Sequence, residues 1–325
     1  MNPIDRALLA ALRAAPVHLP GGELAAALDV PPEVIAARVA ELCAAGFEIE
    51  DRPGLGYRLL RTPDRLIADD LHARLGTSDF IREVLVFAET DSTNQRALDL
   101  GAAGAEGGVA IFAERQTAGR GRFSRRWESA AHRGMWFSLL LRPALPLADW
   151  PRLTTWAAVA LADAVEQASG LPVRIKWPND LQLHGRKLAG ILSEVGQDRA
   201  GRHFAVVGLG VNVNHTEDDF PAELRPLATS LQIESRRLLD RPALAAMTLD
   251  SLATWFARLG TDFPAILAAA RRRSTLLGER VTIQTGGLAV TGLAEDLDEE
   301  GRLILLMDDG KREVFGAGEA SIAKS

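Results

Sequence analysis

Cysteine is nearly absent from this sequence. Cys43 is the only one among 325 residues, so an intrachain disulfide is excluded and the composition is compatible with a reducing compartment. Because Cys43 follows Leu42 and lies at helical spacing from Val39, we expect a buried core thiol rather than a nucleophile. The six histidines are scattered without a His-x3-His or Cys-x2-Cys partner, which argues against a transition-metal site.

Long apolar runs and a basic leader are also missing. The most apolar window, residues 153–165, is too short to span a bilayer and contains Asp163. The first residues include Asp5 and no basic segment, so a secretory signal is not predicted. The formal net charge of −6 argues against a nucleic-acid coat or a membrane-surface protein. We therefore expect a soluble cytoplasmic protein with no membrane partner.

Positive charge is concentrated in one loop, residues 116–127, which reads Gln-Thr-Ala-Gly-Arg-Gly-Arg-Phe-Ser-Arg-Arg-Trp. It holds four arginines within seven positions. Guanidinium groups stay charged at any working pH and their forked donors match phosphate or carboxylate, while glycine lets a backbone approach a ligand closely. The loop therefore predicts an anion site that suits a polyphosphate. The alternative is a solvated basic loop.

A second motif follows at residues 174–180, which end in Lys-Trp-Pro-Asn-Asp and so cluster an amine, an amide and a carboxylate. Residues 181–183 alternate between apolar and polar, residues 184–186 form a turn, and a second strand follows. This pattern is typical of a short hairpin. The hairpin is expected to bring Asp180 and Lys187 close together.

With these motifs the sequence resembles the biotin protein ligases, specifically the bacterial type with an added N-terminal domain like those that bind DNA. The resemblance rests on five segments in the family's order and spacing: Asp91 to Asn94, residues 116–127, Lys176 to Asp180, Gly185 to Leu192, and Gly208 to Asn212. Each segment alone is weak, but together they are specific. The resemblance as a whole covers the chain from about the first expected helix to the last expected strand.

The apolar periodicity predicts helices over residues 4–15, 23–28, 33–45, 64–75, 95–100, 150–169, 242–259 and 263–273. Besides the hairpin, it predicts strands over residues 47–50, 57–60, 84–88, 107–115, 134–141, 204–208, 280–284, 289–294, 303–307 and 312–315. With the resemblance, this order implies an α+β protein. A winged helix-turn-helix is expected over 1–62, a ligase catalytic domain with a mixed, largely antiparallel sheet over 63–274, and a small SH3-like β-barrel over 275–325. A dinucleotide-binding fold is not predicted, because Gly208-x-Gly210 lacks the third glycine.

The resemblance implies biotin–[acetyl-CoA-carboxylase] ligase activity in two steps. Biotin and ATP give biotinyl-5′-AMP and pyrophosphate, with Mg²⁺ present, and a lysine of a biotin carboxyl carrier protein then takes the biotinyl group. Biotin contacts are implied for Ser92, Thr93, Asn94, Gln116, Arg120, Gly121, Arg122 and Lys187. ATP or adenylate contacts are implied for Arg120, Arg122, Arg125, Trp127, Lys176, Asn179 and Asn212. The last residues, 321–325, lack an arginine that is common in the family, so no ATP contact is assigned to the tail.

Three side chains are the catalytic candidates: Lys187, Asp180 and Arg122. Lys187 is expected to bridge the biotin carboxylate and the α-phosphate, while Arg120, Arg122 and Mg²⁺ reduce the repulsion between two anions. The acceptor lysine has an unperturbed pKa of about 10.4, so it needs a carboxylate that takes its proton. Asp180 is either that proton acceptor or a Mg²⁺ ligand, and the sequence does not choose.

Two other functions stay open. A lipoate or octanoate ligase would share the adenylate chemistry but need a long apolar channel; the Arg-Gly-Arg and Lys-Trp-Pro-Asn-Asp motifs favour biotin. A non-catalytic transcriptional regulator would sense biotin without turning it over. Pyrophosphate release with ATP and biotin separates such a regulator from an enzyme.

The N-terminal region carries little positive charge for a DNA-binding domain. Through residue 63 there are six arginines, no lysine and eight acidic residues. On the expected recognition helix Arg38 is the one good donor, beside Glu33 and Glu41, and Arg52 and Arg58 on the wing are the expected phosphate contacts. We therefore expect at best a weak biotin-responsive repressor. Its operator DNA and its oligomeric state, with a homodimer as one option, stay open.

Overall fold

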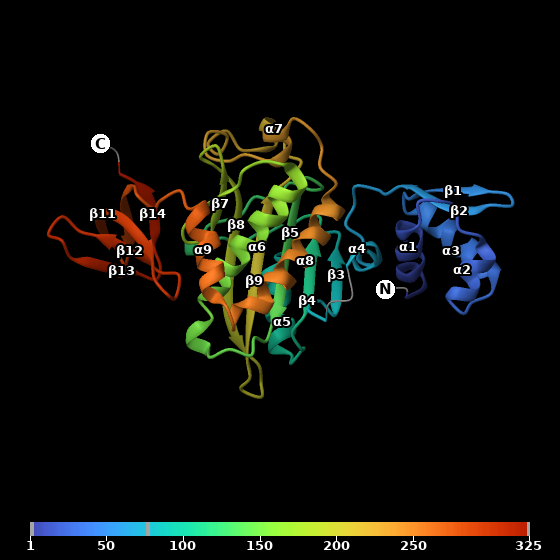
Figure 1. Ribbon diagram of the computed structural model, residues 1–325, viewed down its shortest axis with the longest axis horizontal. Helices are drawn as coiled ribbons and strands as arrows, with labels where there is room; N and C mark the ends of the chain where they lie inside the picture. The colour runs from blue at the N-terminus through green and yellow to red at the C-terminus, as the bar shows by residue number, and fades with distance from the viewer. Residues whose placement is uncertain (1–2, 76–78, 324–325) are drawn as a thin grey trace. The chain divides into compact units, whose positions relative to one another are not determined.

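A computed structural model of the chain describes residues 3–75 and 79–323. The chain divides into two compact units (Figure 1). The first contains Met1–Thr77 together with Asp240–Ala246, and the second contains Ser78–Leu239 and Met247–Ser325. Residues 76–78 of the expected linker lie outside the described residues. Within the described residues, no helix is both long and apolar enough to cross a membrane.

The first unit has the expected succession of short helices and a two-stranded sheet. Its elements are α1 (Pro3–Ala14), α2 (Gly21–Ala27), α3 (Pro32–Ala44), β1 (Glu48–Arg52), β2 (Gly56–Arg61) and α4 (Ala68–Arg74). The apolar stripes of α1 and α3 meet in one core that includes Leu8, Leu9, Ile35 and Val39.

Two expectations for this unit are wrong. Cys43 is exposed, because the buried stripe of α3 runs through Ile35, Val39 and Leu42, and the next residue turns away from the core. The helix expected from residue 64 begins only at Ala68. The Asp64 carboxylate and carbonyl both accept hydrogen bonds from the fully buried Arg241 guanidinium, at 2.9 Å each, which holds the residues before the helix in another conformation.

The second unit is organised around a seven-stranded sheet. Its order is β3 (Glu83–Phe87), β4 (Val109–Ala113), β5 (Gly134–Leu141), β9 (His203–Asn212), β8 (Arg186–Gln197), β7 (Asp180–Leu183) and β6 (Arg174–Lys176). Only the β3–β4 pair is parallel among these neighbours, so the expected mixed, largely antiparallel sheet is confirmed. Every residue of β5 is buried, and Trp136 is a core side chain as predicted.

Helices cover both faces of this sheet. Ser193 and Glu194 are consecutive on β8 and therefore point to opposite faces. Ser193 bonds Thr154 of α6 (Arg152–Ser169), whereas Glu194 bonds Asn94 of α5 (Thr93–Ala102). The remaining helices are α7 (Leu231–Ser235), α8 (Arg241–Leu259), which begins in the first unit, and α9 (Phe263–Arg273), with 3-10 turns at Arg122–Ser124, Leu147–Asp149 and Glu217–Asp219.

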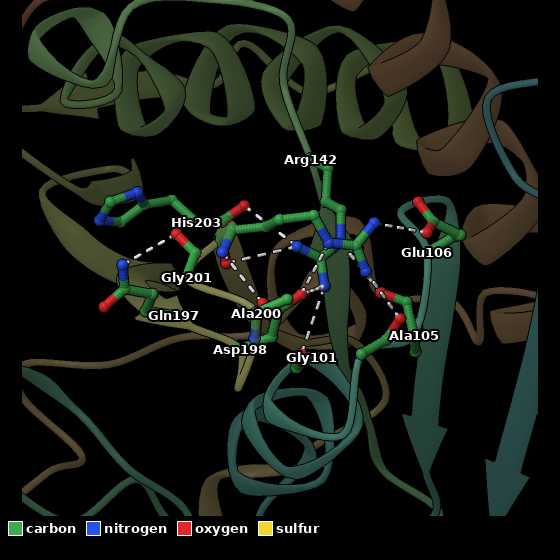
Figure 2. Close-up of polar contacts among 11 residues, drawn as sticks. Gly101, Ala105, Glu106, Arg142, Gln197, Asp198, Ala200, Gly201 and His203 are labelled. Atoms are coloured by element: carbon green, nitrogen blue, oxygen red, sulfur yellow. Dashed lines mark hydrogen bonds and ion pairs between the residues drawn. The ribbon is translucent and has the colours of Figure 1, made fainter.

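A group of polar contacts around Arg142, which we call the clamp, lies where β5 and β8 end and β9 begins (Figure 2). Arg142 donates to the carbonyls of Gly101 and Ala105 and to the Asp198 carboxylate, which it meets at 3.0 Å. Burial of Asp198 acts to raise its pKa, but hydrogen bonds from Arg202 and from backbone N–H groups outweigh that effect and lower it. The clamp ties α5 to the β8–β9 turn.

The chain ends in a separate five-stranded antiparallel sheet. Its order is β13 (Arg312–Phe315), β12 (Leu303–Leu306), β11 (Leu288–Leu297), β10 (Arg280–Thr285) and β14 (Glu319–Ile322). The first four strands in chain order were expected, but β14 was not. This last strand pairs with β10 and brings the tail of the described chain back into the fold.

Candidate functional site

One cavity of about 550 Å³ in the second unit collects the predicted site residues. Its lining includes all of the predicted biotin and ATP positions: Ser92, Thr93, Asn94, Gln116, Arg120, Gly121, Arg122, Arg125, Trp127, Lys176, Asn179, Asp180, Lys187 and Asn212. These residues come from segments up to 120 positions apart, from Ser92 to Asn212. The remaining candidates, Arg38, Arg52 and Arg58, belong to the first unit.

The start of α5 forms a polar wall of this cavity. Ser92 occupies the N-cap position of α5, but its side chain makes no capping hydrogen bond. The Gln116 side-chain oxygen instead accepts from the Thr93 backbone N–H at 2.8 Å, and the Gln116 amide nitrogen donates to Ser129 at 3.2 Å. Because Gln116 contacts both α5 and Ser129, its amide is oriented before any ligand arrives.

The arginine loop crosses to the C-terminal sheet. Arg122 donates to the Asn179 side-chain oxygen at 3.0 Å and to the Gly318 carbonyl at 3.2 Å, and burial lowers its pKa. Arg125 forms a two-pronged ion pair with Glu319, at 2.8 and 2.6 Å, which lowers the pKa of that carboxyl. Between these arginines, Phe123 and Ser124 have φ values of 55° and 58°, a left-handed conformation that costs non-glycine residues energy.

The predicted hairpin places its two charges together, as expected. Lys187 Nζ lies 2.7 Å from Asp180 Oδ1 and 5.3 Å from the centre of the Trp127 ring. Asp180 Oδ1 is buried and makes no aligned hydrogen bond, so its contact with Lys187 is an ion pair. Lys187, the candidate cation, and Asp180, the candidate proton acceptor, therefore lie side by side in the cavity.

The packing of Trp127 explains why two positions of the motifs are glycine. A Cβ at Gly190 would lie 2.8 Å from its ring, and a Cβ at Gly210 would lie 2.7 Å from it. These glycines are direct partners on β8 and β9, so they form a flat place in the sheet on which the indole packs. The Trp127 ring also meets the buried Trp136 edge-on, with ring centroids 6.2 Å apart.

Two lining segments were missed from the sequence. Phe220, Leu224, Pro226 and Leu227 supply an apolar side, and the Leu227 carbonyl accepts from the Lys187 backbone N–H at 2.8 Å. Gly318, Glu319 and Ala320 supply another side, just before the tail to which no contact was assigned. Neither segment has a recognisable motif, and Lys324 and Ser325 of that tail lie outside the described residues.

Metal ligands are sparse in this cavity. Across residues 3–75 and 79–323, no group of three or more histidine, cysteine, aspartate or glutamate side chains is placed to hold an ion. The lining carboxylates are Glu128, Asp180 and Glu319. Since Glu319 is paired with Arg125, Asp180 is the carboxylate that lies with Lys187 at the hairpin.

Comparisons with known proteins agree with the motifs. The sequence matches the Biotin/lipoate A/B protein ligase family over residues 86–212 and the Biotin protein ligase C terminal domain over residues 276–322. The bifunctional ligase/repressor BirA of Bacillus spizizenii is 33% identical over 298 residues, which cover 91% of this chain and 92% of that protein. The biotin--[acetyl-CoA-carboxylase] ligase of Mycobacterium tuberculosis is 37% identical over 274 residues, which cover 82% of this chain and 96% of that protein.

A solved structure shows the same similarity in three dimensions. The biotin protein ligase from Aquifex aeolicus in complex with biotin and ATP superposes with a TM-score of 0.65 at 29% identity. The match covers 75% of this chain and 100% of that chain. The family resemblance inferred from the five motif segments is thereby confirmed.

Proposed function

The chain belongs to the biotin protein ligase family, and from this premise we propose that it acts as a biotin–[acetyl-CoA-carboxylase] ligase. It would join biotin to AMP with release of pyrophosphate, and then transfer the biotinyl group to a lysine of a biotin carboxyl carrier protein. The observation that carries this proposal is the convergence of the predicted positions in one cavity, with Lys187 and Asp180 2.7 Å apart.

In the first step the residues have to bring two anions together. We assign the biotin end to the polar wall of Thr93, Asn94 and Gln116, and the phosphates to the side of Lys176, Asn179 and the arginine loop. Lys187 lines the same cavity, and we assign it to both the biotin carboxylate and the α-phosphate. A fixed cation there stabilises the charge that develops as the carboxylate oxygen attacks phosphorus and pyrophosphate leaves.

In the second step the acceptor lysine must lose a proton to attack the acyl carbon. Asp180 is our proton acceptor, because it is the carboxylate of the cavity lining that lies beside Lys187. The lysine nitrogen forms the amide bond, and AMP leaves with the electrons of the broken acyl–phosphate bond.

Magnesium fits this cavity as an ion held mainly by substrate. Mg²⁺ commonly uses one or two carboxylates together with substrate phosphates, and Asp180 would supply the carboxylate only in place of its role as proton acceptor. When bound it would neutralise phosphate charge. Because the cavity has few carboxylates, we propose that substrate phosphates supply most of the Mg²⁺ ligands and that protein side chains supply few.

The test is a pyrophosphate-release assay with the full chain, ATP and Mg²⁺. We expect a release that depends on biotin, followed by biotinylation of a carrier domain. Parallel assays with lipoate and octanoate should give little release, because polar residues line much of the cavity. Tight biotin binding without pyrophosphate would instead indicate a regulator, and a preference for lipoate or octanoate would indicate the related ligases.

For the domains we propose boundaries at 1–62, 63–274 and 275–325. The first three helices and the two-stranded sheet support a winged helix-turn-helix, and the five strands from Arg280 onward support a small SH3-like barrel. The similarity to a bifunctional ligase/repressor raises a second function for the first unit, namely repression of transcription.

The charges of the first unit support only weak DNA binding. Arg38 donates to the nearly buried Asp5 at 2.6 Å and lies 2.6 Å from the Glu41 carboxylate, so its charge is already neutralised. Arg52 of the β1 strand is paired with Glu50 at 2.9 Å. Of the three DNA candidates, Arg58 alone is an exposed donor with no ion pair among the described residues, and a homodimer would double it.

A gel-shift of the biotin-saturated protein against its genomic upstream regions checks this. We expect dissociation constants no tighter than about 10⁻⁶ M at physiological salt, the range of non-specific binding. Glu41→Gln, which removes an exposed negative charge beside Arg38, should strengthen binding, whereas Glu295→Gln in the C-terminal sheet should not. Nanomolar, sequence-selective binding by the unaltered protein would show that the charge argument is wrong.

A further inference from the structure

Glu194 on β8 is a carboxylate that the proposed reaction does not use. Its side chain is 21% exposed, and its two oxygens have different partners. Oε2 accepts from the Asn94 amide nitrogen at 2.8 Å, and Oε1 accepts from the Arg120 guanidinium at 2.7 Å. Arg120 also donates to the Gln95 side-chain oxygen at 3.3 Å. Glu194 thus joins the first arginine of the loop to the first turn of α5.

The Asn94 end of this link is firmly anchored. Asn94 is 4% exposed, and its side-chain oxygen accepts from the fully buried Ser138 hydroxyl at 2.6 Å. A Cβ at Gly208 would lie only 1.9 Å from the same oxygen, so the amide is pressed against the β9 backbone. Because its oxygen is taken by Ser138, Asn94 can only present its nitrogen to Glu194.

The other end of this link, Arg120, belongs to a loop that repulsion between its own charges tends to open. The loop packs several guanidinium groups into a few residues, and like charges favour an open loop. On the far side, Arg125 is tied to Glu319 by an ion pair whose side chains are 64% and 47% exposed. The Glu194 link is less exposed and ends on a buried network, so it is the more rigid of these two ion pairs.

We propose that Glu194 is a positioning residue of the ligase. By holding Arg120 against the anchored Asn94, it keeps residues 119–121 over the biotin end of the cavity and slows the escape of biotin and of the adenylate. The inference rests on the proposed function and gives Glu194 no contact with substrate. The proposal also gives Arg120 a different role. Its ion pair with Glu194 holds the loop closed, whereas the sequence motifs predicted that its charge would face the ligand anions.

The test is a double-mutant cycle with Glu194→Gln, Arg120→Ala and the double variant. The measurements are the dissociation constant for biotin and the rate at which preformed biotinyl-5′-AMP is lost in a chase experiment. Each single variant should raise the dissociation constant and the rate of adenylate loss by about tenfold. The double variant should show the same values as the single variants, because the two substitutions break the same contact. Glu194→Asp, which keeps the charge with a shorter reach, should fall between the unaltered protein and Glu194→Gln.

Glu106→Gln is the matched control. Glu106 also pairs with an arginine, Arg202 at 2.9 Å, but at the clamp near the β8–β9 turn, and it does not line the cavity (Figure 2). This variant should keep the affinity and release rate of the unaltered protein. Unchanged biotin affinity in Glu194→Gln, or additive losses near a hundredfold in the double variant, would overturn the inference.

The binding measurement also separates this inference from the proposed function. If the unaltered protein binds biotin but releases no pyrophosphate, the enzymatic function fails. A Glu194-dependent affinity would then still support the positioning role, and an affinity independent of Glu194 would overturn both.

Discussion

Lys187→Ala is expected to lower the rate of pyrophosphate release by roughly 10²- to 10³-fold, the loss typical of one positioned charge-stabilising group. The ammonium lies 2.7 Å from Asp180 and lines the cavity that we assign to biotin and ATP. Without it, the repulsion between the biotin carboxylate and the α-phosphate is no longer offset by the ammonium group between them. The measurement is biotin-dependent pyrophosphate release at saturating ATP.

The fold should tolerate this change. The Lys187 side chain is 36% exposed, while its backbone makes the structural contacts, donating to the Leu227 carbonyl and accepting from the Thr229 N–H. The control is Lys311→Ala, which removes an exposed lysine that also pairs with an aspartate, Asp309 at 2.6 Å. Near-normal pyrophosphate release by a folded Lys187→Ala protein would remove Lys187 from the assigned role.

Regular elements could be predicted where local pattern and tertiary packing agree. The β5 strand and α9 match their expected limits, because continuous apolar residues in one and helical periodicity in the other both face the core. The β9 strand was expected to end at Gly208 but continues to Asn212. Glycine weakens a strand by its own propensity, and here the space it leaves is filled by Asn94 and by Trp127.

The site was located by its motifs, but its internal partners were not visible in the sequence. The arginine loop was expected to face ligand anions, and the structure also gives Arg120 and Arg125 carboxylate partners within the protein, Glu194 and Glu319. These partners lie 74 and 194 positions further along the chain, so local pattern could not identify them. The β14 strand was missed for the same reason, since only its pairing with β10 makes those residues a strand.

The ion pair at the loop's far end has a defined pH dependence. Hydrogen bonding from Arg125 lowers the pKa of Glu319, so this carboxyl stays ionised at pH values where an ordinary glutamate begins to protonate. Its contribution is therefore fully present above the ordinary glutamate pKa and is lost as the pH falls through the lowered one. The attachment of the loop to the C-terminal sheet should not vary across neutral pH.

Asp180→Asn is expected to separate the two steps of the reaction. Pyrophosphate release should change by less than about tenfold, whereas transfer from preformed biotinyl-5′-AMP to the carrier lysine should fall by roughly 10²- to 10⁴-fold, the usual contribution of a general base. Asparagine keeps the shape of the side chain but cannot take the proton from the attacking amine. Single-turnover transfer to a carrier domain measures this step alone.

The pH profile makes the assignment sharper. The variant should recover activity as the pH rises toward about 10.4, where free lysine loses its proton without help. Asp218→Asn, a change at a 93% exposed carboxylate on the segment near the cavity, should leave both steps unchanged. If Asp180→Asn instead slows pyrophosphate release and added Mg²⁺ restores it, the carboxylate acts as a metal ligand, because a proton acceptor would not be replaced by more magnesium.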